Sequence, residues 1–283
     1  MRTGIALPNQ VRDVRPDVIP VWARQAEEAG FSSLGTIGRI AYPGVMDTVA
    51  LASAAGATST IGLLSDVILA TTWPGVLLAK EAASIDGVSG GRFTMGIGVG
   101  LREDDFVAYG HGPRDRGARL DRDLEEYLSV WDGQPVGGGE NPAVPQGTRR
   151  VPLMFGAFSP IAMRRMAKYG EGYIGATVPP AMAAEAFAGA RAAWRAAGRD
   201  GEPRLIGCAY VAVGDVDRTL FSVGDYYAAA GAFQRVALDA VCTTPGAITD
   251  LIKQYTDLGA DEVILSVGTD DIDDVARLAD IVL

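Results

Sequence analysis

The chain has 283 residues, of which 48% are hydrophobic and 21% are charged, and its net charge is −10. This length and apolar content suffice for one large core, and a (β/α)8 barrel typically needs about 250 residues. The acidic balance argues against nucleic acid as a partner, because phosphate binding requires clustered lysine and arginine. No uninterrupted apolar run reaches about 18 residues, so the sequence predicts no membrane span.

Cysteine and histidine are scarce, which narrows the possible chemistry. Cys208 and Cys242 lack metal-ligand spacing, and the N-terminal residues do not form a secretion signal, so we expect a reduced, cytoplasmic protein. His111 is the only histidine. A histidine-rich zinc site is thereby excluded, and no metal is expected. His111 lies in a loop rich in Gly, Pro and Arg, where a place in a lid is favoured over catalysis.

The first half of the chain alternates apolar, strand-like runs with amphipathic segments. The predicted strands are 3–8, 32–37, 61–70 and 93–99, and the predicted helices are 17–30, 47–57, 75–87 and 117–132. A charged loop, LREDDFVAYGHGPRDR, separates the fourth strand from its helix.

Residues 133–150, rich in Gly and Pro, interrupt this alternation. A hairpin or ordered insertion is favoured over a domain linker, because a new strand, VPLMFGA, follows at once. The later strands are predicted at 172–177, 204–213 and 261–267, and the later helices at 159–170, 180–197 and 271–283, with two or three more within 215–258. Eight strand–helix units favour one (β/α)8 TIM-barrel domain over residues 1–283, with an open doubly wound sheet as the alternative.

The most specific pattern lies in residues 61–100, where a strand and a proline precede VLLAK-x-AAS-x-D, SGGRF and a run of glycines. This pattern resembles the luciferase-like monooxygenase superfamily, and weaker similarity extends along most of the chain. The resemblance implies a TIM barrel that uses a flavin such as FMN or the deazaflavin coenzyme F420. In such a barrel the active site lies where the strands end.

Two strand ends are candidates for contact with the cofactor ring. The fourth strand ends in a G-x-G-x-G pattern that includes Gly98 and Val99. Missing side chains there would let a flat ring approach, whereas close backbone packing is the alternative. On the third strand, the resemblance places a bulge with a non-proline cis bond at Asp66–Val67, against the ring. A hydrated or arginine-paired carboxylate is the alternative for Asp66.

The turn after the fifth strand contains Gly156, Ala157 and Ser159. Ser159 is a candidate N-cap, and Pro160 suits the first helical position. In the superfamily the cofactor phosphate lies near this turn, so the resemblance implies phosphate binding here. A plain helix cap explains the same residues equally well.

The second strand ends in Gly38 and Arg39, where many relatives have an Asp–His pair. A histidine-dependent mechanism therefore cannot be transferred to this chain. Gly38 remains a candidate cofactor contact. Arg39 cannot act as a base, but it can hold an anionic ring, carboxylate or phosphate; an ion pair with a loop acid is the alternative. Within the charged stretch 102–105, Asp104 is the candidate general acid or base. The alternative is that the charged side chains of this stretch are simply solvated.

The sequence therefore predicts a coenzyme F420-dependent oxidoreductase that transfers a hydride to or from a small organic substrate. The first alternative is an FMN-dependent monooxygenase supplied by a separate flavin reductase, because no NAD(P)H fingerprint is present. The second is a non-catalytic flavin-binding protein, since the Asp–His pair is missing. A cofactor-free aldolase or isomerase ranks below these. The resemblance also implies a homodimer.

Overall fold

A computed structural model describes residues 1–108, 112–156 and 159–283. Its strands form one sheet in which all neighbouring strands are parallel. The described strands are β1 (Arg2–Ala6), β2 (Ser33–Thr36), β3 (Gly62–Ser65), β4 (Ile68–Leu69), β5 (Phe93–Gly98), β6 (Leu153–Gly156), β7 (Gly172–Thr177), β8 (Arg204–Val211) and β9 (Glu262–Val267). The sheet closes because β5 pairs with β3 and β4, which together form a single interrupted barrel strand. The predicted TIM barrel is confirmed, and the open doubly wound sheet is wrong.

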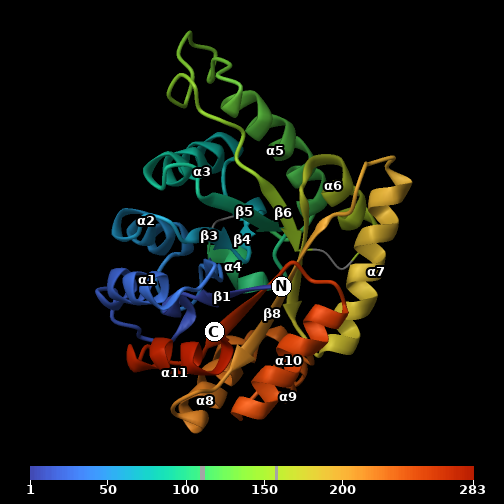
Figure 1. The fold of residues 1–283 in the computed structure, drawn as a ribbon. Coiled ribbons are helices and arrows are strands. Elements are labelled where there is room, and N and C mark those ends of the chain that lie inside the picture. Colours follow the sequence, from blue (N-terminus) through green and yellow to red (C-terminus); the bar gives the residue numbers. More distant parts are fainter. Residues whose placement is uncertain (109–111, 157–158) are drawn as a thin grey trace.

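Helices surround the barrel (Figure 1). The described helices are α1 (Val18–Ala29), α2 (Asp47–Ala57), α3 (Gly75–Val88), α4 (Glu103–Ala108), α5 (Arg116–Trp131), α6 (Pro160–Tyr169), α7 (Pro180–Ala196), α8 (Val216–Tyr226), α9 (Phe233–Asp239), α10 (Pro245–Asp257) and α11 (Asp273–Val282). The predicted charged loop contains α4, whose first turn carries three acidic residues that favour a helix start. None of the described helices combines the length and apolarity needed to cross a membrane.

Two apolar layers stabilise the barrel. Inward-facing side chains fill its interior and come from Ala6, Leu64, Met154, Ile174, Ile206, Cys208 and Ile264. A larger cluster lies between the outward faces of the strands and the surrounding helices. Because both faces of the strands are buried, their sequences are almost continuously apolar, as in other all-parallel sheets.

Two insertions leave the barrel at opposite ends. Residues 133–150 follow α5, which runs antiparallel to the strands, so this insertion extends from the amino end. Pro135 and Pro142 form an antiparallel bridge within it, and Figure 1 shows it projecting away from the barrel. It is an insertion and not a domain linker, because β5 and β6 on either side of it pair directly.

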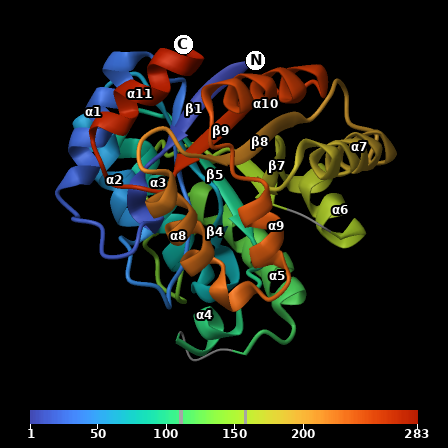
Figure 2. The same cartoon turned by 90° about the horizontal axis from the view of Figure 1, so that it is seen from below.

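The second insertion, residues 213–242, extends from the carboxyl end of β8 and returns to it. The Cys242 N–H donates to the Tyr210 carbonyl at 3.0 Å, and the Ala212 N–H donates to the Cys242 carbonyl at 2.9 Å. In Figure 2, α8 and α9 lie with α4 at the end of the molecule away from the two chain termini. This segment therefore covers the carboxyl mouth of the barrel.

Arg92 of the SGGRF motif has a structural role at the amino end. Its guanidinium donates to the carbonyls of Ala55 and Thr58 at the end of α2, at 3.1 and 2.9 Å, and to the Ile61 carbonyl at 2.6 Å. A cation is favourable at the carboxyl end of a helix. The most specific part of the sequence pattern thus includes a residue that joins α2 to the third barrel strand.

Substitutions at two glycines, one as the test and one as the control, measure how closely the third and fourth barrel strands pack. A Cβ on Gly96 would lie 2.0 Å from the Ser65 carbonyl oxygen, whereas one on Gly87 in α3 would meet nothing within 4 Å. We expect Gly96→Ala to lower the free energy of unfolding by about 1–3 kcal/mol or more. Gly87→Ala should leave it unchanged or raise it by up to about 1 kcal/mol. Urea unfolding of both variants measures this, and equal effects would contradict the close packing.

Candidate active site at the carboxyl end of the barrel

The third barrel strand is interrupted at the bond that the family resemblance indicated. Asp66–Val67 is a cis peptide bond, and it lies between β3 and β4. Between its two pairings with β5, this strand advances from residue 64 to 68, whereas β5 advances only from 94 to 97. The extra residue defines a bulge. Both the predicted bulge and the predicted cis bond are confirmed.

Three predicted cofactor-lining glycines surround Val67 in the bulge. A Cβ on Gly98 would lie 2.9 Å from Val67 Cγ2, and one on Gly156 would lie 3.3 Å from Val67 Cγ1. A Cβ on Gly38 would lie 2.5 Å from Asp47 Oδ2 and 3.0 Å from the Val67 carbonyl oxygen. The ends of four barrel strands therefore meet at one partly exposed valine, with no other side chain from these positions.

The remaining positions of the G-x-G-x-G pattern have structural explanations. Gly96 packs against the β3 backbone, and Gly100 has a φ of +76°, which a residue with a side chain rarely adopts. Val99 is partly buried against the outer apolar cluster, and its carbonyl accepts a hydrogen bond from Thr71 at 2.9 Å. Of the two predicted contacts on this strand, Gly98 borders Val67 and the Val99 side chain packs into the core.

Asp66 places a carboxyl group inside the barrel, just below its mouth. The Cys208 thiol donates to Asp66 Oδ2 at 2.8 Å, and none of the ion pairs among the described residues joins Asp66 to an arginine. Burial raises the Asp66 pKa to about 7, although the thiol hydrogen bond opposes the shift. A carboxyl group with this pKa can either hold or release a proton near neutral pH.

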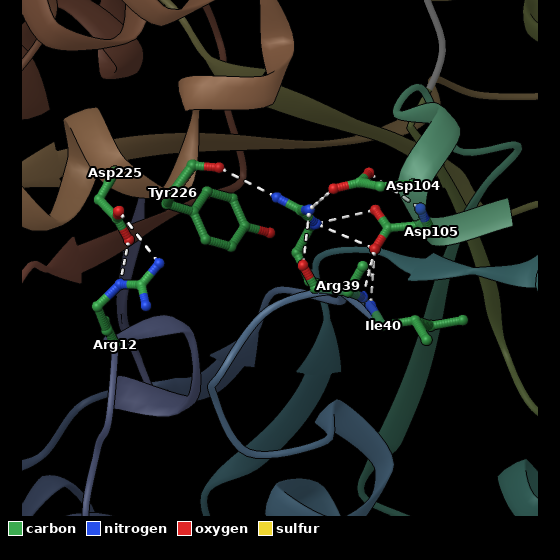
Figure 3. A network of polar contacts seen from close by, with 8 residues as sticks. Arg12, Arg39, Ile40, Asp104, Asp105, Asp225 and Tyr226 are labelled. Atoms are coloured by element: carbon green, nitrogen blue, oxygen red, sulfur yellow. Dashed lines mark hydrogen bonds and ion pairs between the residues drawn. The ribbon is translucent and has the colours of Figure 1, made fainter. Parts of the chain in front are cut away.

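Arg39 and Asp104, the two predicted catalytic residues, form an ion pair of 2.7 Å (Figure 3). Arg39 Nε also lies 2.9 Å from a carboxylate oxygen of the buried Asp105. Its two terminal nitrogens donate to the Tyr226 and Ala41 carbonyls, each at 3.2 Å. The ion pair that was the alternative for Arg39 is present, and a catalytic role for either residue stays a prediction.

A second arginine, Arg102, occupies a different environment. It follows β5, and its guanidinium carbon lies 4.8 Å from the Tyr226 ring centre and 5.0 Å from that of Tyr227. The Tyr227 hydroxyl is 3.0 Å from Thr177 Oγ1 at the end of β7. Burial raises the pKa of both tyrosines, so their phenols are neutral at physiological pH.

Ser159 caps α6 as predicted: its Oγ accepts a hydrogen bond from the Ala162 N–H at 3.3 Å, and Pro160 follows the cap. A cleft of about 650 Å³ begins at Ser159 and Pro160 and continues between α6, β7 and α7, outside the barrel. Phosphate binding at Ser159 stays a prediction. Ala157 and His111 lie outside the described residues.

Sequence reasoning did not identify Cys208, Tyr226 or Tyr227 as site residues. Cys208 lies two residues from both Ile206 and Tyr210 along β8, so the two-residue period of a strand places all three on one face. Tyr226 and Tyr227, at the end of α8, are harder to recognise as site residues from sequence. They lie over the barrel only because residues 213–242 return to β8.

Comparison with known proteins identifies the family. The family model described as luciferase-like monooxygenase matches residues 1–220. The chain belongs to this family. An uncharacterized protein of Mycobacterium tuberculosis is 31% identical to this luciferase-like protein over 168 residues, or 56% of this chain and 59% of the relative. The 4-hydroxyprotoasukamycin monooxygenase of Streptomyces nodosus subsp. asukaensis is 27% identical over 171 residues, or 56% of this chain and 43% of that enzyme. The chain thus matches less than two thirds of the length of these relatives.

Solved structures share the fold of this luciferase-like protein. An F420-dependent secondary alcohol dehydrogenase, in complex with an F420–acetone adduct, has a TM-score of 0.79 and 15% identity, covering 100% of this chain and 98% of that one. The FMN-bound oxygenating constituent of 3,6-diketocamphane monooxygenase from Pseudomonas putida has a TM-score of 0.75 and 16% identity, covering 99% and 95%. At these identities the comparison establishes the fold alone.

Asp105 provides a test of how the mouth is held together. We expect Asp105→Ala to lower the free energy of unfolding by about 3–5 kcal/mol, because the buried Arg39 guanidinium loses a partner. The backbone N–H groups of Ile40 and Ala41, which donate to Asp105 Oδ1 at 2.9 and 2.8 Å, lose their acceptor too. Urea unfolding measures the loss. The control is Asp239→Ala on the exposed surface, which should change stability by less than about 1 kcal/mol; a similar effect of both variants would contradict the proposed importance of Asp105.

The raised pKa of Asp66 leads us to expect that the stability of the folded protein depends on pH. Below about pH 4 its carboxyl group is protonated in the folded and unfolded chains alike, so stability does not vary with pH there. Between about pH 4 and its folded pKa of about 7, only the unfolded chain ionises, and the stability contributed by the protonated group is lost as pH rises. Asp66→Asn should therefore gain about 1–3 kcal/mol relative to the natural protein over this range and no more above it. A stability difference that does not change with pH would refute the raised pKa.

Proposed function

We propose that this luciferase-like protein is a coenzyme F420-dependent oxidoreductase acting on a small organic substrate. The arrangement of Gly38, Gly98 and Gly156 around Val67 carries this proposal. A flat ring system needs an approach with few side chains, and these three positions contribute none of their own at the carboxyl mouth, where barrel enzymes place their active sites.

The residues present fit a cofactor of this shape. The ring would lie against Val67, with Asp66, Gly38, Gly98, Val99 and Gly156 around it, and the N-terminus of α6 at Ser159 would receive a phosphate. The Val99 contact would come from its backbone. Bound coenzyme F420 supplies hydride transfer, and the protein supplies position and electrostatics.

Asp66 is the group best suited to handle a proton in this site. Its carboxyl pKa of about 7 allows it to hold a proton and release it near neutral pH, which the ion-paired Arg39 cannot do. Cys208 orients the carboxyl group through its 2.8 Å hydrogen bond. Tyr226 and Tyr227, both buried, lie at the same mouth, where Asp66 itself is partly exposed.

An FMN-dependent monooxygenase is the second candidate, supported by the similarity to the Streptomyces nodosus monooxygenase over 56% of the chain. It would require a separate reductase. A non-catalytic flavin-binding protein is the third candidate, supported by the replacement of the family's Asp–His pair by Gly38 and Arg39. The homodimer and the cytoplasmic location expected from the sequence stay predictions.

Fluorescence titration of the apo protein with coenzyme F420, and separately with FMN, tests the proposal. We expect micromolar or tighter binding of F420 and weaker binding of FMN. The reverse preference would favour the monooxygenase, and binding of neither would refute the cofactor assignment. Binding with no turnover of any alcohol, ketone or enone tested would favour the non-catalytic alternative.

The position of the cofactor is tested by Gly98→Val, which adds a side chain next to Val67. We expect the variant to bind the preferred cofactor at least about tenfold more weakly, because the added methyl groups occupy the ring's position. Gly87→Ala, on the exposed face of α3, is the matched control and should bind normally. Unchanged binding by Gly98→Val would show that the ring lies elsewhere, even if the cofactor is correct.

A further inference from the structure

Arg102 at the barrel mouth has a buried donor without an acceptor. Its Nε is shielded from solvent and has no hydrogen-bond partner within the part of the chain that the structure describes. None of the ion pairs found among residues 1–108, 112–156 and 159–283 includes Arg102. Buried charged donors are normally paired, so an unpaired one next to a candidate active site indicates a ligand.

Of the three acids that follow Arg102 in the sequence, Glu103 is exposed and forms no ion pair among the described residues, and the other two are already engaged. Asp104 and Asp105 both pair with Arg39, and Asp105 also accepts two backbone N–H groups. Arg39 and Arg102 therefore differ sharply although both lie near Tyr226. The charge of Arg39 is neutralised by two carboxylates, whereas that of Arg102 lies over aromatic rings in a protein whose net charge is −10.

Two further donors belong to the same aromatic cluster. The buried hydroxyls of Tyr210 and Tyr226 make no well-formed hydrogen bond among the described residues, although that of Tyr210 lies close to the Tyr227 hydroxyl. The Tyr210 and Tyr227 ring centres are 6.1 Å apart, and those of Tyr226 and Tyr227 are 5.0 Å apart. One guanidinium and two neutral hydroxyls thus lie on one apolar wall. This combination complements an anionic oxygen group attached to a flat or small apolar body.

A series of contacts links this aromatic wall to Asp66. The Tyr227 hydroxyl contacts Thr177, Thr177 pairs with Cys208 across β7 and β8, and Cys208 donates to Asp66. A ligand held at Arg102 would therefore lie at the same mouth as the carboxyl group of Asp66 and the adjacent bulge.

We propose that Arg102 binds a carboxylate of the substrate, with Tyr210 and Tyr226 as additional donors, so that the protein acts on small organic acids. The redox chemistry performed on that acid rests on the proposed function. The recognition itself depends only on the geometry of Arg102 and the tyrosine cluster.

Matched acids and amides test this recognition, because they share a shape and differ in charge. Benzoate and benzamide, and acetate and acetamide, are titrated calorimetrically into the full chain, with and without the cofactor it binds. We expect each acid to bind at least about tenfold more tightly than its amide. Arg102→Gln should abolish that preference, and Arg102→Lys should retain part of it because it keeps the charge. The exposed Arg235→Gln is the control and should behave like the natural protein.

Three results would overturn the inference. The first is equal binding of acid and amide by the natural protein, and the second is an acid preference that persists in Arg102→Gln. The third is a loss of F420 or FMN binding in Arg102→Gln, which would assign the arginine to the cofactor. If the natural protein binds neither cofactor, the proposed function fails, while the acid–amide comparison still decides this inference.

Discussion

The barrel mouth depends on one buried carboxylate, that of Asp105. It accepts the backbone N–H groups of Ile40 and Ala41 and pairs with the guanidinium of Arg39, so it joins the loop after β2 to the helix after β5. A buried carboxylate needs compensating partners, and here three donors hydrogen-bond to Oδ1, while Oδ2 lies 2.9 Å from Arg39 Nε in the ion pair. This arrangement sets the path of both loops and removes Arg39 from the set of free cations.

The remaining polar groups of the mouth follow from that arrangement. With Asp104 and Asp105 engaged by Arg39, Arg102 lies over Tyr226 and Tyr227 without a carboxylate partner. Below this level lie an apolar layer and the hydrogen-bonded carboxyl group of Asp66, and at the amino end the buried Glu262 pairs with Arg204 and Ser33. A cation, neutral phenols and a carboxyl group with a raised pKa thus lie at separate places within one site. Such a separation suits the binding and protonation of a small polar molecule.

Much of the candidate site could be predicted from local sequence. The Ser159 cap and the glycine at the end of β5 each depend on residues close together in one strand or turn, and the bulge at Asp66–Val67 followed from the family resemblance of residues 61–100. The partners of these residues could not be predicted in the same way. Cys208 lies 142 positions from Asp66, and Asp105 lies 66 positions from Arg39. A single sequence does not show which distant residues come into contact. From the sequence, either Arg39 or Arg102 could have paired with the acids of the charged loop.

The sequence by itself determined the architecture, because eight apolar runs separated by amphipathic segments can bury both faces of a parallel sheet only beneath a layer of helices. It also determined the family, through a pattern concentrated in one β-α-β unit. Only the tertiary structure decided which cation is neutralised and which is unpaired, and which tyrosines cover the mouth. The physical reason is that hydrogen bonds and ion pairs depend on distances of a few ångströms, and barrel closure and the return of residues 213–242 to β8 set those distances.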